Sequence, residues 1–157
     1  MGLDQYFHRE VHTYEMVRDG DTCKTVDGID IPAANLGGSV SRTTDDRVGY
    51  LRKANAVHGW IVDNLAGGED ECQRIHLSVE DVSALLREVE FALATGEGME
   101  PRSGFFFGST DKDEYWREDL KTTRDILTWI LDDAKVSKPD PENSYWYTVD
   151  YYYQASW

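Results

Sequence analysis

The hydrophobic positions of residues 48–65 (VGYLRKANAVHGWIVDNL) recur at helical spacing. The stripe that they form consists of Tyr50, Ala54, Val57, Ile61 and Leu65. Such a stripe is typical of a helix that packs one face against a core. The acidic pair at 45–46 can cap its start, and the glycine pair at 67–68 ends it. We therefore predict a helix over residues 48–65.

Two further helices follow in the sequence. Ser78 and Asp81 have the spacing of a capping box, with Asp in place of the usual Glu or Gln. The helix that they begin ends at Gly96 and Gly98, and its apolar residues are Val82, Leu85, Leu86, Val89 and Leu93. A third helix is predicted from Thr110 or Asp111 to about Ala134. Its inward residues are Trp116, Leu120, Thr123, Leu127, Ile130 and Leu131.

Alternation of apolar and polar residues predicts the strands. Residues 2–9 and 144–157 alternate, the second stretch most clearly, and residues 73–78 fit a short strand. The polar region 19–46 contains Asp27-Gly28, which suits the positive φ angles of a two-residue type I′ turn and so predicts a hairpin. Lys138-Pro139-Asp140-Pro141 cannot continue a helix and predicts a turn or linker.

This order of elements indicates one α+β domain over residues 1–157. We expect a small antiparallel or mixed sheet that includes both terminal strands. About three helices pack on it, and residues 19–46 are inserted as a loop with a hairpin. A chain of 157 residues is long enough for one domain with a core of its own.

Charge and composition limit the classes of partner and function that fit this chain. The net charge of −14 repels nucleic acid and anionic membranes, so neither is expected as a partner. No apolar run approaches the ~20 residues of a membrane span. Two cysteines, Cys23 and Cys72, do not make a disulfide framework and are expected as reduced thiols in a cytosol. The acidity leaves open a mimic of DNA that inhibits a nucleic-acid enzyme, although the acids are scattered and 12% of residues are aromatic.

One candidate site is the group Arg52, Lys53, Asn55 and His58, which lies beside the apolar stripe. Between residues 42 and 58 four basic residues outnumber two acidic ones, a local inversion in an acidic chain. Arg52 can clamp a phosphate or carboxylate by its bidentate fork, and the amide and imidazole can contact a sugar or base edge. The alternative is that the two cations form salt bridges with neighbouring acids and that His58 lies in the core.

A second candidate is the loop RSGFFFGSTD at residues 102–111, which enters the third helix. Its backbone N–H groups can bind a phosphate or carboxylate, while its phenylalanines stack a base. It is not a Walker loop, because the lysine of that motif is missing. The alternative is a tight turn that buries three aromatic rings. The candidate residues of this loop are Arg102, Ser103, Gly104, Phe105, Phe107, Gly108, Ser109 and Thr110.

Other features are weaker. Cys72 and His76 have metal-ligand spacing, but a zinc site needs three or four ligands. The acids between Asp111 and Asp119 suit the start of a helix, with a magnesium site as the alternative. We therefore expect no metal, no cofactor and no catalytic residue. The C-terminal stretch holds five tyrosines and two tryptophans, more than one small sheet face needs, which favours a homodimer across this sheet.

The segments MGLDQY, GYLRKANAVHGW, SGFFFGSTDKDEYWREDL and YYYQASW resemble a family of small, poorly characterised proteins from tailed bacteriophages. The resemblance covers a third to a half of the chain and leaves out residues 13–46. It implies a phage origin and the cytoplasm of the host cell. It assigns no activity, but small phage proteins of this kind include some that sequester nucleotide immune signals of the host.

Together these observations favour a homo-oligomeric binding protein for a small, anionic, nucleotide-derived ligand. The cluster at 52–58 meets the phosphate or sugar, and residues 103–110 close over it. One alternative is a hydrolase of such a nucleotide, with His58 or His76 as its general base. The other is an acidic inhibitor of a host protein or a DNA mimic.

Overall fold

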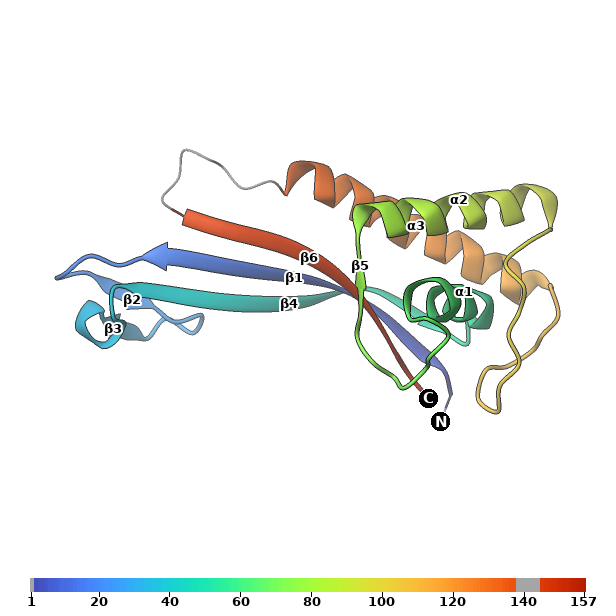
Figure 1. Cartoon of the computed structure of the whole chain (residues 1–157), viewed down its shortest axis with the longest axis horizontal. Coiled ribbons are helices and arrows are strands. Elements are labelled where there is room, and N and C mark those ends of the chain that lie inside the picture. The colour runs from blue at the N-terminus through green and yellow to red at the C-terminus, as the bar shows by residue number, and fades with distance from the viewer. Residues whose placement is uncertain (1, 138–144) are drawn as a thin grey trace.

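A four-stranded antiparallel sheet carries three helices in the computed structural model, which describes residues 2–137 and 145–157 (Figure 1). The strand order is β4-β1-β6-β5. The strands are β1 (Asp4–Met16), β4 (Ser39–Arg52), β5 (Ile75–Leu77) and β6 (Tyr145–Ser156), and the helices are α1 (Asn55–Leu65), α2 (Val79–Thr95) and α3 (Glu114–Val136). The α+β class and the presence of both terminal strands in one sheet are confirmed.

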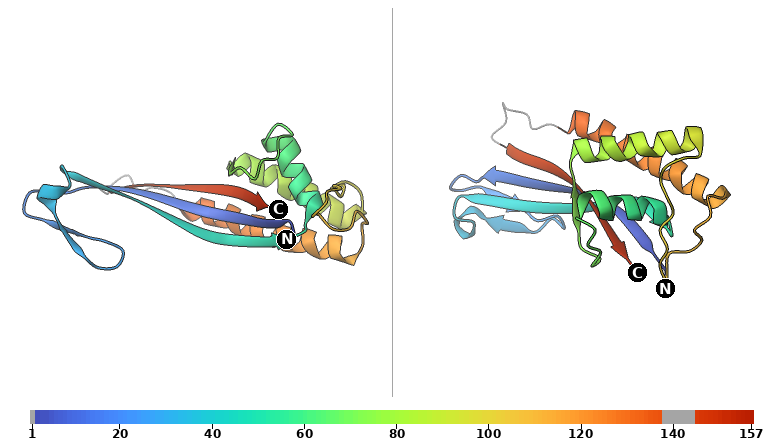
Figure 2. Two further views of the ribbon diagram at one scale, coloured as in Figure 1. Left: turned by 90° about the horizontal axis from the view of Figure 1, so that it is seen from below. Right: turned by 45° about the vertical axis from the view of Figure 1, so that its right-hand side comes forward.

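One face of this sheet packs against helices. Phe7 of β1 lies opposite Tyr153 of β6, and both side chains are fully buried. His58 of α1 contacts Tyr153, and Asp133 of α3 contacts Tyr151 on the same face. The helices gather at one end of the sheet, while β1, β4 and β6 continue past them (Figures 1 and 2). The main hydrophobic cluster of the described residues therefore lies at the helical end of the sheet.

The prediction of a helix over residues 48–54 is wrong, because residues 48–52 are the end of β4 and residues 53–54 form the turn that leads into α1. It pairs with β1 in a register that places Tyr50 opposite Tyr6. Asp45 is likewise a strand residue, ion-paired to His8 at 2.9 Å, and not a helix cap. The helix begins only at Asn55. The β1–β4 pairing explains the difference, since it satisfies the backbone of this segment across two long strands.

The region 19–46 is also more ordered than predicted. Its last part, residues 39–46, belongs to β4, and the N-terminal strand runs to Met16, well beyond residue 9. A small ribbon of β2 (Thr22–Lys24) and β3 (Asp30–Pro32) forms at the predicted hairpin, followed by a 3₁₀ turn at Ala33–Asn35. The type I′ turn is wrong: Lys24 pairs with Asp30 around a five-residue loop, in which Gly28 has φ +86° and Asp27 has no positive φ.

The helices α2 and α3 agree closely with the sequence pattern. The Ser78–Asp81 capping box forms, and Gly96 ends α2 in the left-handed conformation. The cap of α3 is Asp113, not Thr110 or Asp111. The buried residues of α3 are Trp116, Leu120, Thr123, Leu127 and Ile130. The predicted turn at 138–141 lies outside the described residues. None of the described helices is long and apolar enough to cross a membrane.

Candidate functional site

A pocket of about 390 Å³ lies where β4 passes into α1 and where α3 begins. One wall is formed by residues 52–57, from the end of β4 into the first turn of α1. The other is formed by the loop before α3 and by the first turns of that helix. The loop residues are Pro101, Gly108, Ser109 and Asp111, and the residues of α3 and its cap are Asp113, Tyr115, Trp116, Asp119 and Leu120.

The turn from β4 to α1 is held by the buried Gln5. Its side-chain carbonyl accepts from the backbone N–H of Ala54 at 2.9 Å, and its amide donates to the Ala54 carbonyl at 3.1 Å. Lys53, one residue earlier, adopts a left-handed conformation with φ +60°, which is uncommon for a residue other than glycine. Strained backbone of this kind gathers at functional sites.

Asn55 fixes the loop before α3 to the start of α1. Its side-chain amide donates to the carbonyls of Phe107 and Ser109 at 3.0 and 2.8 Å, and its oxygen accepts from the backbone N–H of Arg102 at 3.2 Å. The side chain is buried, and these bonds engage its oxygen and its amide group. Asn55 therefore fixes the loop before α3 beside α1. Because Asn55 also lines the pocket, its contact with a ligand stays a prediction.

The cationic wall consists of Arg52 and Lys53. No carboxylate in residues 2–137 or 145–157 lies within ion-pairing distance of either side chain, so the salt bridges that were the alternative to a site are not formed there. The Lys53 stem passes Gly108, where an added Cβ would lie 3.4 Å from it. The helix α1 begins without a side-chain cap. The first-turn N–H groups of Ala56 and Val57 therefore have no acceptor within the helix and add positive potential to this wall.

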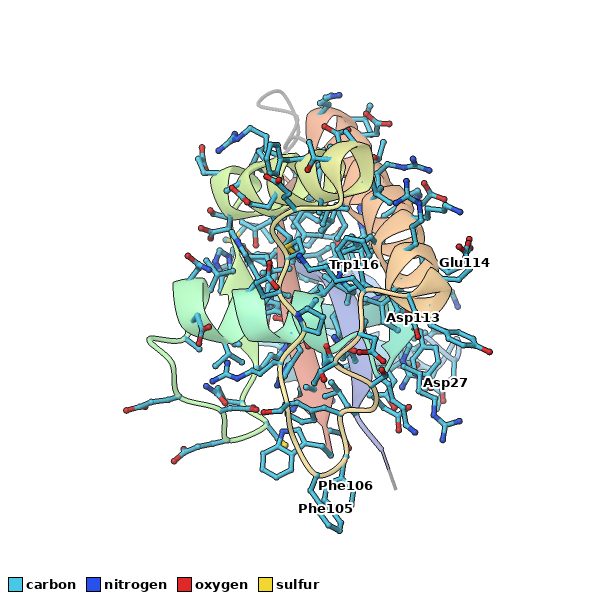
Figure 3. All side chains as sticks on the ribbon, turned by 90° about the vertical axis from the view of Figure 1, so that its right-hand side faces the viewer. Asp27, Phe105, Phe106, Asp113, Glu114 and Trp116 are labelled. Atoms are coloured by element: carbon cyan, nitrogen blue, oxygen red, sulfur yellow. The ribbon has the colours of Figure 1, made fainter. Side chains whose placement is uncertain are left out.

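The opposite wall is acidic. Asp113 caps α3 by accepting from the backbone N–H of Trp116 at 3.0 Å (Figure 3). Six residues further along, burial raises the pKa of the Asp119 carboxyl from its usual 3.8 to about 6, and the nearby charge of Asp113 adds to the rise. Tyr115 lies beside them with 81% of its surface exposed. The pocket thus joins a cationic wall, an acidic wall and an accessible aromatic ring.

His58 does not reach this pocket. It is 1% exposed, and its ring nitrogens lie 2.8 Å from the Tyr153 hydroxyl and 2.8 Å from an Asp70 oxygen. Because the Tyr153 hydroxyl accepts from Gln5, it can donate to Nδ1 of His58, and Nε2 then donates to the carboxylate. The prediction of a ligand contact for His58 is corrected, because its side chain is buried and both ring nitrogens are hydrogen-bonded within the protein.

The phenylalanine loop does not close over the pocket. Phe105 is 95% exposed and projects from the loop tip, away from the helices (Figure 3), whereas Phe106 beside it is partly buried against the core. Phe107 is buried, with its ring edge-on to His58. Gly104 is needed there, because an added Cβ would lie 2.6 Å from the Phe107 ring. Gly108 and Ser109 line the pocket, whereas Ser103, Gly104, Phe105, Phe107 and Thr110 do not.

Arg102 also lies outside the pocket. Its guanidinium pairs with Asp63 at 3.0 Å, and its stem packs beside Gly59 on another side of α1. Tyr115 was given no role in the sequence-based prediction. Asp119 was grouped with the acids that suit a helix start, with a magnesium site as the alternative, because an acidic stretch there has a sufficient structural explanation. Within the described ranges, no three His, Cys, Asp or Glu side chains are grouped so as to hold a metal ion.

The chain was also compared with known proteins. No protein-family model, curated protein or solved structure matches it. The case for a function therefore rests on the charges, the burial and the geometry of the pocket itself.

Proposed function

We propose that this protein binds a small, anionic, nucleotide-derived ligand in the pocket between β4, α1 and α3, and that it sequesters the ligand without converting it. The observation that carries the proposal is the pair of cations at Arg52 and Lys53. In a chain of net charge −14 they face the pocket without a described carboxylate partner. Unpaired cations beside the start of a helix are suited to a phosphate group.

The remainder of the pocket suits the rest of a nucleotide. Its volume of about 390 Å³ falls in the range of roughly 300–1,000 Å³ that is usual for small-molecule sites. The exposed ring of Tyr115 offers a face on which a base can stack. Lys53 and Ser109 both line the pocket, so a ligand there contacts segments that are far apart in the sequence.

The resemblance to phage proteins extends this proposal. A phage protein that holds a host nucleotide signal in the host cytoplasm would act as an anti-defence sponge, and tight binding would suffice for that role. A homo-oligomer would hold several such ligands per assembly.

One observation favours hydrolysis as the second candidate. Asp119 lines the pocket with a pKa of about 6, which suits a general acid or base near neutral pH. The histidines expected for this role do not line it: His58 is buried, and His76 lies on β5 beside Tyr152, on the sheet face opposite the helices. A hydrolase at this pocket would therefore depend on Asp119.

A thermal-shift panel of cyclic and linear nucleotides tests the proposal. A ligand at 100 times its Kd stabilises the folded state by about 2.7 kcal/mol, a shift of several degrees for a chain of this size. Arg52→Ala should lower the affinity for a stabilising nucleotide by about 10- to 100-fold, because its contact with the phosphate is lost. Arg87→Ala, which changes an exposed cation of α2 outside the pocket, should leave it unchanged.

Chromatography of the hit after heat release separates the two candidates. Intact ligand supports sequestration, whereas altered ligand supports the hydrolase. If no nucleotide shifts the melting temperature, or if Arg52→Ala and Arg87→Ala bind equally well, the proposal is wrong.

A further inference from the structure

The acidic wall of the pocket contains a carboxylate without a partner. Asp119 is half-buried in α3, and its side chain accepts no hydrogen bond and pairs with no cation among the residues that the structure describes. Its neighbour Asp113 instead caps the helix. Partly removing a carboxylate from water is unfavourable unless a donor compensates for the lost hydration. Because Asp119 lines the pocket, this carboxylate is free to accept from a donor group of a bound ligand in place of water.

The two walls restrict what that donor can be. Arg52 and Lys53 attract an anion, but Asp113 and Asp119, which line the same pocket, repel one. Inorganic phosphate or a compact polyphosphate would satisfy only the cationic wall. A ligand with an anionic group at one end and a hydrogen-bond donor at the other satisfies both walls, and the acidic wall then acts against purely anionic competitors.

We propose that the ligand carries a base with an exocyclic amino group, and that this amino group donates to the carboxylate of Asp119 while the phosphate meets Arg52 and Lys53. This inference rests on the proposed function and adds the class of base. Carboxylates accept from exocyclic amino groups when proteins read bases. Tyr115, on the same helix, lies where the ring that carries the amino group can stack.

Matched nucleotides that differ only in the amino group test the inference. Calorimetry at pH 7.5 compares adenine with unsubstituted purine, and guanine with hypoxanthine, each as the linear or cyclic monophosphate that gives the larger thermal shift. We expect the amino-bearing member of at least one pair to bind about 10- to 100-fold more tightly, since a hydrogen bond to a charged group is worth that much.

Substitution of Asp119 then tests whether this residue causes the preference for the nucleotide with the amino group. Asp119→Ala should reduce the difference within that pair to less than about 2-fold, while the nucleotide without the amino group binds at least as well as before. Asp125→Ala is the matched control, because Asp125 is an exposed residue of α3 that pairs with Arg124. It should retain the full preference.

The outcomes separate this inference from the function on which it rests. Nucleotide binding that depends on Arg52 but shows no preference within either pair overturns the inference and leaves the proposed function intact. A preference that persists in Asp119→Ala also overturns it. If no nucleotide binds the unsubstituted protein, both fail. The comparison on the unsubstituted protein stands even if Asp119→Ala does not fold.

Discussion

Replacement of Asp119 by Asn should stabilise the ligand-free protein. The folded chain holds the proton on Asp119 with a pKa of about 6, against 3.8 for an ordinary carboxyl. Between these two pH values the folded state binds more protons than the unfolded state, so this group lowers stability as the pH rises from about 4 to 6. Above about pH 6 the full destabilisation by Asp119 is present, and below about pH 4 it is absent.

The magnitude follows from the same two values. Their difference corresponds to about 3 kcal/mol for a fully effective charge. Asp119 is only half-buried and faces an open pocket, so water reduces the effect, and we expect about 1–2 kcal/mol at pH 7.5. The melting temperature should therefore rise by roughly 2–8 °C.

Urea unfolding of the two proteins at pH 4 and pH 7.5 measures this difference directly. Asp119→Asn should match the unsubstituted protein at pH 4 and exceed it at pH 7.5. Asp125→Asn, whose carboxylate is 72% exposed, should change neither value by more than about 0.5 kcal/mol. If Asp119→Asn is less stable at pH 7.5, or gains the same amount at both pH values, the reasoning from burial is refuted.

Three further predictions concern the frame that holds the pocket. Gly49→Ala should destabilise the fold by about 1–3 kcal/mol, because the new Cβ would lie 2.7 Å from the Ile126 side chain and would push β4 away from α3. An unchanged midpoint of urea unfolding would contradict this. Tyr153→Phe removes the hydroxyl that lies 2.8 Å from His58 and should lower stability by about 1–3 kcal/mol in chemical denaturation, an expectation that a neutral result would overturn. Ser78→Ala removes the cap of α2 and should reduce the free energy of unfolding by about 1 kcal/mol, with unchanged nucleotide binding; a loss below about 0.3 kcal/mol would argue against the capping box.

The sequence predicts best where local signals and tertiary packing agree. The inward face of α3 follows from a 3.6-residue period, and the start of α2 follows from the Ser78–Asp81 box. Both features depend on neighbours within a few residues. The predicted strand at the C-terminus is β6 for the same reason, since period-two alternation continues over its whole length.

Prediction fails where long-range pairing decides the structure. Tyr50 and Ala54 fit a helical stripe with Val57, but β1 takes the segment up to Arg52 into the sheet. The first part of β4 carries few apolar residues, since its two faces extend beyond the helices. Pairing with β1, whose residues lie more than twenty positions earlier in the sequence, makes this segment extended.

Part of the candidate site could be predicted, because some of its residues give a signal in the local sequence and others do not. Arg52 and Lys53 were predicted because they belong to a local excess of basic residues in an acidic chain. Ser109 was predicted because it lies in the glycine-bounded loop at residues 102–111. The pocket brings these segments together. Asp119 gives no such signal, because an acid near a helix start is common. Its burial beside Asp113 arises only once α3 packs against the end of β4.

The bonds of Asn55 bear on how the pocket would work. Because one buried side chain ties the loop carbonyls of Phe107 and Ser109 to α1, the two walls are in place before any ligand arrives. A preorganised site avoids the free-energy cost of ordering a loop during binding. Closure of the phenylalanine loop is then unnecessary for tight binding, and the outward position of Phe105 is compatible with the proposed role. Under the proposed role, sequestration requires affinity and not turnover, and a preorganised pocket lined by charges of both signs would supply affinity without a moving lid.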